Sequence, residues 1–318
     1  MFEELVNPMN ILFDSTLSDT VRRHRLYSGD IFVFSPRPSS VALCNLARGM
    51  IEEAFGSSSP EEAQHHLPVE EFVAILAPLK PKFIHHPESR RLIQGVLAEV
   101  RCDMEKSYLD VPRLRAVTHG GYLTSGVGYA HHPHRDTWYS APMCQLNWWL
   151  PICSFQPESS MAFHPHYWSC AVKNGSAEFN YYQWNADGRR NAAQHIRTDT
   201  RKQPKPEEPM ELDPQVRIVC EPGGIIVFSA AQMHSTVPNT SGRTRFSLDF
   251  RTIHLDDAAG MTGAANIDSA PTGTSLRDFM RASDLERVPN EVVRLYESEE
   301  PVAEAVVFRP VQGEGVLQ

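Results

Sequence analysis

Two histidines and one aspartate form the most informative set of residues in this sequence. His134 and Asp136 are separated by a single arginine, and His234 follows far downstream. Two imidazoles and one carboxylate can occupy one face of a mononuclear iron ion and leave the opposite positions open for a co-substrate and O₂. The residues therefore predict a metal site formed by His134, Asp136 and His234, and with it the chemistry of an oxygenase.

The short His-x-Asp motif is weak evidence on its own. The chain has 14 histidines and 39 acidic residues among 318, so roughly two His-x-Asp/Glu triplets are expected by chance. The triplet that begins at His254 has no histidine after it to serve as the distal ligand. The triplet that begins at His86 is typical of a helix start, with proline and an acid in the first turn. Only the middle triplet lies between strand-like segments and has a suitable distal histidine. The three triplets are His86-Pro87-Glu88, His134-Arg135-Asp136 and His254-Leu255-Asp256.

The segment around His234 supplies the missing context. A Pro-Gly-Gly turn at 222–224 precedes a β-branched and aromatic run at 225–228, which predicts a buried strand. His234 follows this run, and a second turn cluster covers 238–242. The next segment, 243–250, alternates polar and apolar residues, as a half-buried strand does. The distal histidine is therefore expected between two strands.

The last of these strands is expected to carry a co-substrate contact. Arg245, Ser247 and Asp249 share one face, and the apolar residues between them share the other, so the polar face can look into a barrel while the apolar face packs outward. The guanidinium of Arg245 matches a carboxylate bidentately, and Ser247 can add a hydroxyl donor. The alternative is a structural pair between Arg245 and an acid.

The segment resembles the Fe(II)/2-oxoglutarate-dependent dioxygenases, most closely the phytanoyl-CoA dioxygenase family. The proximal motif of the family is His134-x-Asp136 here, and the resemblance covers roughly 115–170 and 215–252. A Gly-Ser-His stretch of the family falls at Pro165-His166-Tyr167, where only the histidine is present. The distal part of the family pattern is a Gly turn, an apolar strand, a histidine, a Pro-Asn-x-Ser stretch and an arginine, found here at 223–224, 225–228, His234, 238–241 and Arg245.

The resemblance implies both cofactors and a reaction. His134, Asp136 and His234 would bind Fe(II), and Arg245, helped by Ser247, would hold the distal carboxylate of 2-oxoglutarate. With O₂ as the second co-substrate, the products would be succinate, CO₂ and an oxidised substrate. Hydroxylation of a C–H bond is the default outcome, although desaturation, epoxidation or cyclisation could use the same site. Because related halogenases lack the carboxylate ligand, Asp136 disfavours halogenation.

The resemblance also implies an α+β fold with a double-stranded β-helix core, of the jelly-roll or cupin-like type. We expect a single catalytic domain over 1–318. The core would cover 111–254, braced by helices and strands of 1–110 and by a helical C-terminal extension at 255–318. A long polar insert at 171–214 would interrupt the core, with an aromatic first half that suggests a lid and a Pro-rich second half that suggests an exposed loop.

Other side chains are candidates for the site. The segment 143–150 is strand-like and places Gln145 and Asn147 on one face, where they could bond the co-substrate or satisfy neighbouring backbone groups. His131 and His132 are expected in a loop, with some chance of touching substrate. His164 and His166 are expected to line a pocket or to pair structurally rather than to bind a second metal. The candidate substrate contacts, which could equally be core residues, are Trp138, Trp149, His166, Trp168, Tyr181 and Trp184.

Composition bounds the partners. The net charge is −9 and no Lys/Arg-rich block occurs, which argues against a nucleic-acid or anionic-membrane surface. No apolar run reaches the length of a membrane span, and the N-terminus does not resemble a signal peptide, so a cytoplasmic location is expected. The six cysteines lack a C-x-x-C motif and are expected to be reduced. The expected partner is a small, apolar or ring-bearing metabolite; the sequence does not indicate an oligomeric state.

Periodicity outlines the supporting elements. A strand is expected at 30–35, and helices at 39–55, 69–79 and 87–108. Two further helical stretches are expected, around 276–285 and 289–296. The N-terminal helices would brace one face of the sheet that carries the metal motif.

Two other classes of protein could use the same three residues. A non-catalytic, cupin-like metal-binding module would keep His134, Asp136 and His234 but would not need Arg245 and Ser247. A zinc-dependent hydrolase is possible in principle because histidine and carboxylate also suit zinc. The resemblance argues against both, and the breadth of the family suggests a role in secondary metabolism.

Overall fold

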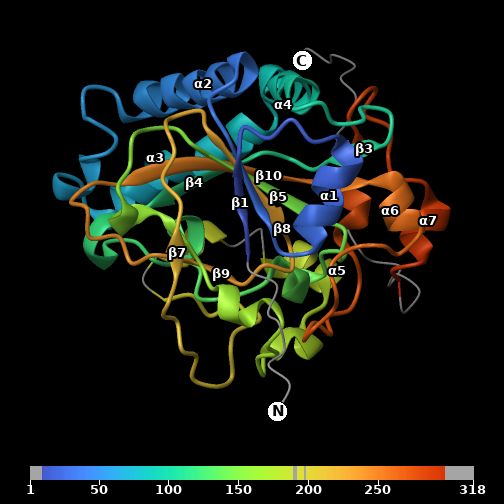
Figure 1. The fold of residues 1–318 in the computed structure, drawn as a ribbon. Helices are drawn as coiled ribbons and strands as arrows, with labels where there is room; N and C mark the ends of the chain where they lie inside the picture. Colours follow the sequence, from blue (N-terminus) through green and yellow to red (C-terminus); the bar gives the residue numbers. More distant parts are fainter. Residues whose placement is uncertain (1–8, 189–191, 197, 298–318) are drawn as a thin grey trace, which may run out of the picture.

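The computed structural model describes residues 9–188, 192–196 and 198–297, which form a mixed α+β fold (Figure 1). The end of the expected C-terminal extension, 298–318, lies outside the described residues. The strands are β1 (Ile11–Phe13), β2 (Ile31–Phe34), β3 (Ser107–Leu109), β4 (Arg113–Val117), β5 (Leu146–Pro151), β6 (Met161–Phe163), β7 (Val216–Arg217), β8 (Ile225–Ser229), β9 (His234–Thr236), β10 (Arg245–His254) and β11 (Met280–Arg281). The α-helices are α1 (Asp19–Tyr27), α2 (Pro38–Phe55), α3 (Val69–Ile84), α4 (Pro87–Glu99), α5 (Tyr181–Gln183), α6 (Leu255–Ala259) and α7 (Asn290–Arg294).

Two sheets divide the strands. The larger has eight strands in the order β1-β2-β8-β5-β10-β3-β11, with β4 also pairing to β10. Its neighbours are antiparallel except for β1 and β2. The smaller sheet has the order β7-β6-β9 and is antiparallel. Strands that are distant in sequence therefore meet in the middle of the larger sheet.

The alternation of β10 decides which side chains face the core. Phe246, Leu248 and Phe250 are buried in the main hydrophobic core, as their spacing predicts. On the neighbouring β5, Leu146 and Leu150 belong to the same core. The residues at the alternate positions of both strands, such as Asn147 and Ser247, lie on the opposite face, where the candidate site lies.

Three helices cover the apolar face of the larger sheet (Figure 1). Helix α2 packs on β5 and α3 on β4, while α4 packs on α2. The last contact is close because Gly95 has no side chain: a Cβ there would lie 2.3 Å from Oγ of Ser39. Helix α4 begins at Pro87, and the ring of His86 accepts a hydrogen bond from the backbone N–H of Glu88. This confirms that His86-Pro87-Glu88 caps a helix.

The helix expected over 87–108 is too long. It ends at Glu99 because Arg101 adopts a left-handed conformation with φ 59°. The backbone N–H of Arg101 bonds the carbonyl of Ala98, and that of Cys102 bonds the carbonyl of Leu97. This is a Schellman ending, which usually has glycine at the left-handed position. Arginine there carries no such signal in the sequence, and the residues that follow form β3.

The helix expected around 276–285 is also wrong. Ser275–Asp278 forms a 3₁₀ turn, and Met280–Arg281 forms β11, which pairs with β3. The unpaired edge of β3 supplies the hydrogen bonds that a helix would otherwise have to provide for itself. The helix expected around 289–296 is confirmed as the shorter α7.

The insert at 171–214 has little regular structure. It contains short helical turns, including α5, and residues 189–191 and 197 lie outside the described part. It is fastened to the segment before β11, since the backbone N–H of Tyr181 bonds the carbonyl of Thr272 and the side chain of Asn174 bonds the carbonyl of Asp268. The insert is therefore anchored at two points.

All six cysteines are free thiols, as expected. Among the described helices, none combines the length and apolar character that a membrane crossing requires.

Candidate metal centre

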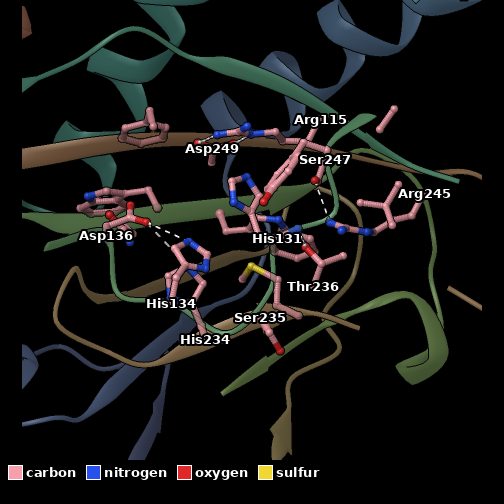
Figure 2. A pocket seen from close by; sticks show the side chains of 18 of the residues that line it. Arg115, His131, His134, Asp136, His234, Ser235, Thr236, Arg245, Ser247 and Asp249 are labelled. Atoms are coloured by element: carbon pink, nitrogen blue, oxygen red, sulfur yellow. Dashed lines mark hydrogen bonds and ion pairs between the residues drawn. The ribbon is translucent and has the colours of Figure 1, made fainter. Parts of the chain in front are cut away.

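The three predicted ligands meet between the two sheets (Figure 2). Nε2 of His134 lies 3.3 Å from Oδ1 of Asp136, and Nε2 of His234 lies 3.9 Å from the same oxygen. One ligand atom from each residue falls within 4.8 Å of the others, and in the described part of the chain these residues form the single group of three or more potential metal ligands. The sequence prediction of a convergent His-Asp-His set is confirmed.

The backbone brings the two histidines together. The N–H of His134 bonds the carbonyl of His234 at 2.9 Å, and the N–H of His234 bonds the carbonyl of His134 at 3.0 Å. This reciprocal pair joins the proximal segment to β9. It fixes the spacing of the two rings, whose centroids are 4.3 Å apart.

Hydrogen bonds at Nδ1 set the tautomer of both rings. Nδ1 of His134 lies 2.8 Å from the carbonyl oxygen of His132, and Nδ1 of His234 lies 2.9 Å from that of Gln232. A carbonyl oxygen only accepts, so Nδ1 carries the proton in each ring and Nε2 presents its lone pair. Metal-binding histidines are held in this way, with the second nitrogen bonded to a backbone carbonyl or carboxylate.

The residue between the proximal ligands has a structural role. Arg135 is buried, and its Nε donates to the carboxylate of Asp268 at 3.0 and 3.2 Å. Its other nitrogens bond the carbonyls of Ala231, Tyr167 and Cys170. Arg135 thus ties the loop that carries His134 and Asp136 to three other segments.

A second arginine holds the carboxylate ligand. Nε of Arg251 lies 3.2 Å from Oδ2 of Asp136, so Oδ1 remains directed at the histidines. Burial alone would raise the pKa of Asp136, but the Arg251 cation outweighs it and holds that pKa well below its usual range. Burial, with His134 beside it, lowers the pKa of His234 to about 3. The site therefore offers one anionic carboxylate and a neutral imidazole from His234.

This donor set fits Fe(II). Imidazole nitrogen and carboxylate oxygen suit iron, and three donors on one side leave the opposite side accessible. The two cavities described next both reach His134 and Asp136. An ion held by the three residues would consequently face open space rather than packed side chains.

The first cavity, here called the Arg245 pocket, has a volume of about 110 Å³. It lies between the larger sheet and β9 of the smaller sheet. Figure 2 shows Arg245 and Ser247 at the opposite end of this cavity from Asp136. Asn147 and Trp149 of β5 also line it. The sheet alternation thus places the predicted co-substrate residues on the same cavity as the ligands.

Arg245 is a buried cation without a carboxylate partner among the described residues. It donates to the hydroxyl of Ser247 at 2.8 Å and lies 5.2 Å from the centroid of the Trp149 ring, while its Nε has no partner. The acid on the same strand, Asp249, is taken by Arg115 at 2.6 and 3.2 Å. Burial lowers the pKa of Arg245 to about 10. An unpaired buried charge is costly, so the pocket favours an anionic ligand.

The second cavity, here called the insert-side pocket, has a volume of about 240 Å³ and shares the metal ligands His134 and Asp136. Tyr181 and Trp184 of the insert line it, and so does Gln145. The Nε2 group of Gln145 donates to Oδ1 of Asn147 at 3.0 Å, and Oε1 of Gln145 has no partner. The two predicted amides therefore lie at the junction of the two pockets.

Three of the predicted substrate residues line neither pocket. Trp138 is fully buried and donates its indole N–H to Asp268. Trp168 packs against Gly29, where a Cβ would lie 2.8 Å from the indole. His166 is exposed beside the ring of Tyr167. These side chains belong to short 3₁₀ turns, in which neighbouring residues point in different directions: Asp136 and Tyr139 line a cavity, whereas Trp138 of the same turn is buried elsewhere.

Two residues that line the pockets, Arg251 and Lys80, escaped the sequence argument, whereas His131 was expected in a loop with some chance of touching substrate. Arg251 continues the polar face of β10 by one more alternate position, so extending that strand would have found it. The ring of His131 stacks on that of His134 with centroids 4.9 Å apart, and its Nδ1 is buried without a partner. Lys80 of α3 lines the insert-side pocket, although nothing in its helix pattern sets it apart. His164 bonds Ser235 and does not join a second metal cluster in the described residues.

Comparison with known proteins found likenesses among solved structures only. No family model matches the sequence, and no curated protein matches it. Among solved structures, EvdO2 from Micromonospora carbonacea var. aurantiaca is 14% identical, with a TM-score of 0.44 over 77% of this chain and 94% of that one.

Two enzymes of nogalamycin biosynthesis are also similar. The non-haem α-ketoglutarate-dependent carbocyclase SnoK is 12% identical, with a TM-score of 0.38 over 76% of this chain and 85% of that one. The epimerase SnoN, solved with Fe³⁺, α-ketoglutarate and a nogalamycin compound, is 13% identical, with a TM-score of 0.36 over 74% of this chain and 85% of that one. At such low similarity, the assignment of chemistry to this chain rests on its own residues.

Proposed function

We propose that this protein is an Fe(II)- and 2-oxoglutarate-dependent oxygenase that oxidises a C–H bond of a small-molecule metabolite. One observation carries the proposal: a convergent His-Asp-His set and a buried arginine without a carboxylate partner lie at opposite ends of one cavity. A dianionic co-substrate that reaches from a metal to a cation would satisfy both ends. Neither a zinc-dependent hydrolase nor a non-catalytic, cupin-like metal-binding module needs the arginine at the second end.

Each residue then has a defined task. His134, Asp136 and His234 would hold the iron, with Arg251 keeping Asp136 ionised and oriented. Iron with 2-oxoglutarate supplies the oxidising power, which is chemistry of the cofactor rather than of the side chains. In the default reaction, one atom of O₂ enters the substrate as a hydroxyl group and the other enters succinate, as 2-oxoglutarate loses CO₂.

The pocket residues position the co-substrate and substrate. Arg245 would pair with the distal carboxylate of 2-oxoglutarate, with the Ser247 hydroxyl beside it, and Asn147 would bond an oxygen nearer the metal. Gln145, also predicted as a co-substrate contact, lines the insert-side pocket instead. The insert-side pocket would take the substrate, since it opens on the same ligands. The insert would act as a lid that excludes water during reaction. This division leaves one pocket for each organic reactant.

The proposal extends to the fold and family. We propose that the larger and smaller sheets are the two halves of a double-stranded β-helix, because the metal ligands lie between them. Within this class, the order of the proximal and distal motifs supports the phytanoyl-CoA dioxygenase family. A tailoring role in secondary metabolism and hydroxylation as the outcome belong to the same proposal.

Anaerobic spectroscopy tests the function without knowledge of the substrate. Fe(II) and 2-oxoglutarate added together should give a visible charge-transfer band that neither gives alone, and admission of O₂ should then release succinate slowly. The Asp136→Ala variant is the matched control and should give neither signal at the same concentrations. If the wild-type protein shows no band and forms no succinate, the proposal is wrong. A hydrolytic activity that appears with Zn²⁺ and survives Arg245→Ala would favour the hydrolase instead.

A further inference from the structure

One wall of the insert-side pocket is aromatic. Tyr139 lies edge-on to the metal ligand His134, with ring centroids 5.6 Å apart. Phe179 contacts Tyr139 at 5.3 Å between centroids, and Trp184 contacts Phe179 at 6.0 Å. These rings form a continuous apolar surface that leads away from the metal ligands. Such a surface fits a flat or ring-bearing molecule.

The same pocket is also lined by five cations. Arginines supply four of them, and their charges are already matched by acids of the protein. The partners are Asp110 for Arg113, Asp249 for Arg115, Asp199 for Arg201, and both Asp110 and Asp136 for Arg251. These four side chains need no further anion.

Lys80 is the fifth cation and differs from the arginines. It projects from α3 into the pocket and donates to the backbone carbonyl of Val127. Among the described residues it forms no ion pair with a carboxylate. Burial lowers the pKa of Lys80 to about 7, and the cations of Arg115 and Arg201 act in the same direction. An ammonium group has three N–H donors, and the bond to Val127 uses one of them.

Two neutral polar groups of the same pocket also lack partners. Oε1 of Gln145 and Oγ of Ser275 are buried and accept or donate no hydrogen bond within the described protein. Buried polar atoms are almost always satisfied, so those that are not point to a missing ligand or solvent. The pocket thus combines an apolar wall with polar groups that await a partner.

We propose that the insert-side pocket recognises a ring-bearing organic acid, with the ring against Tyr139, Phe179 and Trp184 and the anionic group paired with Lys80. This inference rests on the proposed function, and it names the substrate class of the same enzyme. An anion beside Lys80 would give its ammonium group a charged partner. It would also offset the electrostatic repulsion between Lys80 and the cations of Arg115 and Arg201. The carboxylates of 2-oxoglutarate are met in the other pocket by Arg245 and the metal.

Matched acid and amide probes test the proposal. The holoenzyme is kept anaerobic with saturating Fe(II) and 2-oxoglutarate, and binding of indole-3-acetate and indole-3-acetamide is measured by calorimetry. A third arm uses indoxyl sulfate, which distinguishes a carboxylate-specific site from a general anion site. The variants are Lys80→Met, Lys80→Arg and, as a control on the same helix, the exposed Lys82→Met.

The wild-type protein should bind at least one of the two anions roughly tenfold more tightly than the amide, as expected for a charge-assisted bond in a buried site. Lys80→Met should abolish this preference, whereas Lys80→Arg and Lys82→Met should keep it. Unchanged thermal unfolding and an unchanged charge-transfer band would show that Lys80→Met remains folded and loaded. A wild-type protein that binds neither anion more tightly than the amide, or binds none of the three probes, would overturn the proposal, as would a preference that survives Lys80→Met.

Failure of this inference is distinguishable from failure of the proposed function. The band formed by Fe(II) and 2-oxoglutarate reports on the metal centre and Arg245 and does not depend on Lys80. The anion preference is also measurable on protein without either cofactor. A band without an anion preference refutes the substrate class alone, and a preference without a band refutes the oxygenase.

Discussion

The two pockets that meet at the metal ligands are built in different ways. The Arg245 pocket is formed mainly by β4, β5, β9 and β10, so the pleat of the strands sets the direction of its side chains. The insert-side pocket draws on α3, 3₁₀ turns and the insert, and it is about twice as large, at about 240 Å³ against about 110 Å³. The regular pocket suits a constant co-substrate, while the irregular one can vary with the substrate.

The largest expected effect removes the element common to both pockets. His234→Ala should bring succinate formation to background, because it removes one of the three metal ligands and leaves two, His134 and Asp136. Iron content after desalting should fall in parallel. The neighbouring His164→Ala, which alters a buried histidine outside the ligand set, is the control and should retain iron. Normal turnover by His234→Ala would show that the ligand assignment is wrong.

The next effect should separate the two pockets. Arg245→Ala should weaken 2-oxoglutarate binding by roughly 10- to 100-fold, the range expected for a lost bond between charged groups, and should leave iron binding nearly unchanged. Titration of the charge-transfer band at fixed iron measures this directly. The control is Arg243→Ala, which removes an exposed arginine next to the same strand. Equal loss of iron and co-substrate would mean that Arg245 is structural.

A third substitution acts on the ligand that both pockets share. Arg251→Gln should reduce iron affinity by roughly 10- to 100-fold, since a partner behind a metal ligand orients it and tunes its charge. Competition with a chelator gives the affinity. Arg113→Gln provides a matched control, because Arg113 pairs with the same Asp110 carboxylate as Arg251 does. Retention of iron as tight as in the wild type would contradict the role given to Arg251.

The smallest expected effect is on pH dependence and concerns the insert-side pocket alone. The pKa of Lys80 is lowered to about 7, so its ammonium is charged below that pH and neutral above it. The preference for an acid over its amide should therefore decline by a few-fold as pH rises through about 7. Next to Lys80, burial alone would raise the pKa of Asp249, but the Arg115 cation outweighs it and lowers that pKa below its usual value.

The control for this pH effect is Lys80→Arg, which should show a flat profile because a guanidinium keeps its charge. His131, which lines the same pocket, has a pKa held well below 6.5 by burial and by His134, so it does not titrate in this window. A profile that rises with pH, or a decline of equal size in Lys80→Arg, would exclude Lys80 as its source.

The sequence predicted the Arg245 pocket far better than the insert-side pocket. The alternation of Arg245, Ser247 and Asp249 correctly gave the face of a strand, because strand geometry leaves only two choices for each side chain. Asn147 was located by the same rule, whereas Gln145 lies just before β5 and lines the insert-side pocket. Residues in turns obey no such rule, and Trp138 and Trp168 therefore lie away from the pockets they were expected to line.

The end of α4 and the position of Lys80 could not be predicted from local sequence pattern. The left-handed Arg101 ends α4 where glycine would normally give the signal, so the helix was overextended. Lys80 is one of several lysines on an amphipathic helix, and only the packing of α3 against β4 shows that it reaches the pocket. Local pattern predicts which way a side chain points, whereas it does not predict what the neighbouring element leaves open.

The reciprocal backbone bonds between His134 and His234 have a consequence for the order of events during folding. The two ligands are remote in sequence, and closing so long a loop costs conformational entropy that a metal ion alone would have to offset in an unfolded chain. Here the surrounding sheets close the loop by themselves. Iron should consequently bind a preformed site after folding, and a chelator should yield a folded apoprotein, unlike small domains whose structure depends on their metal.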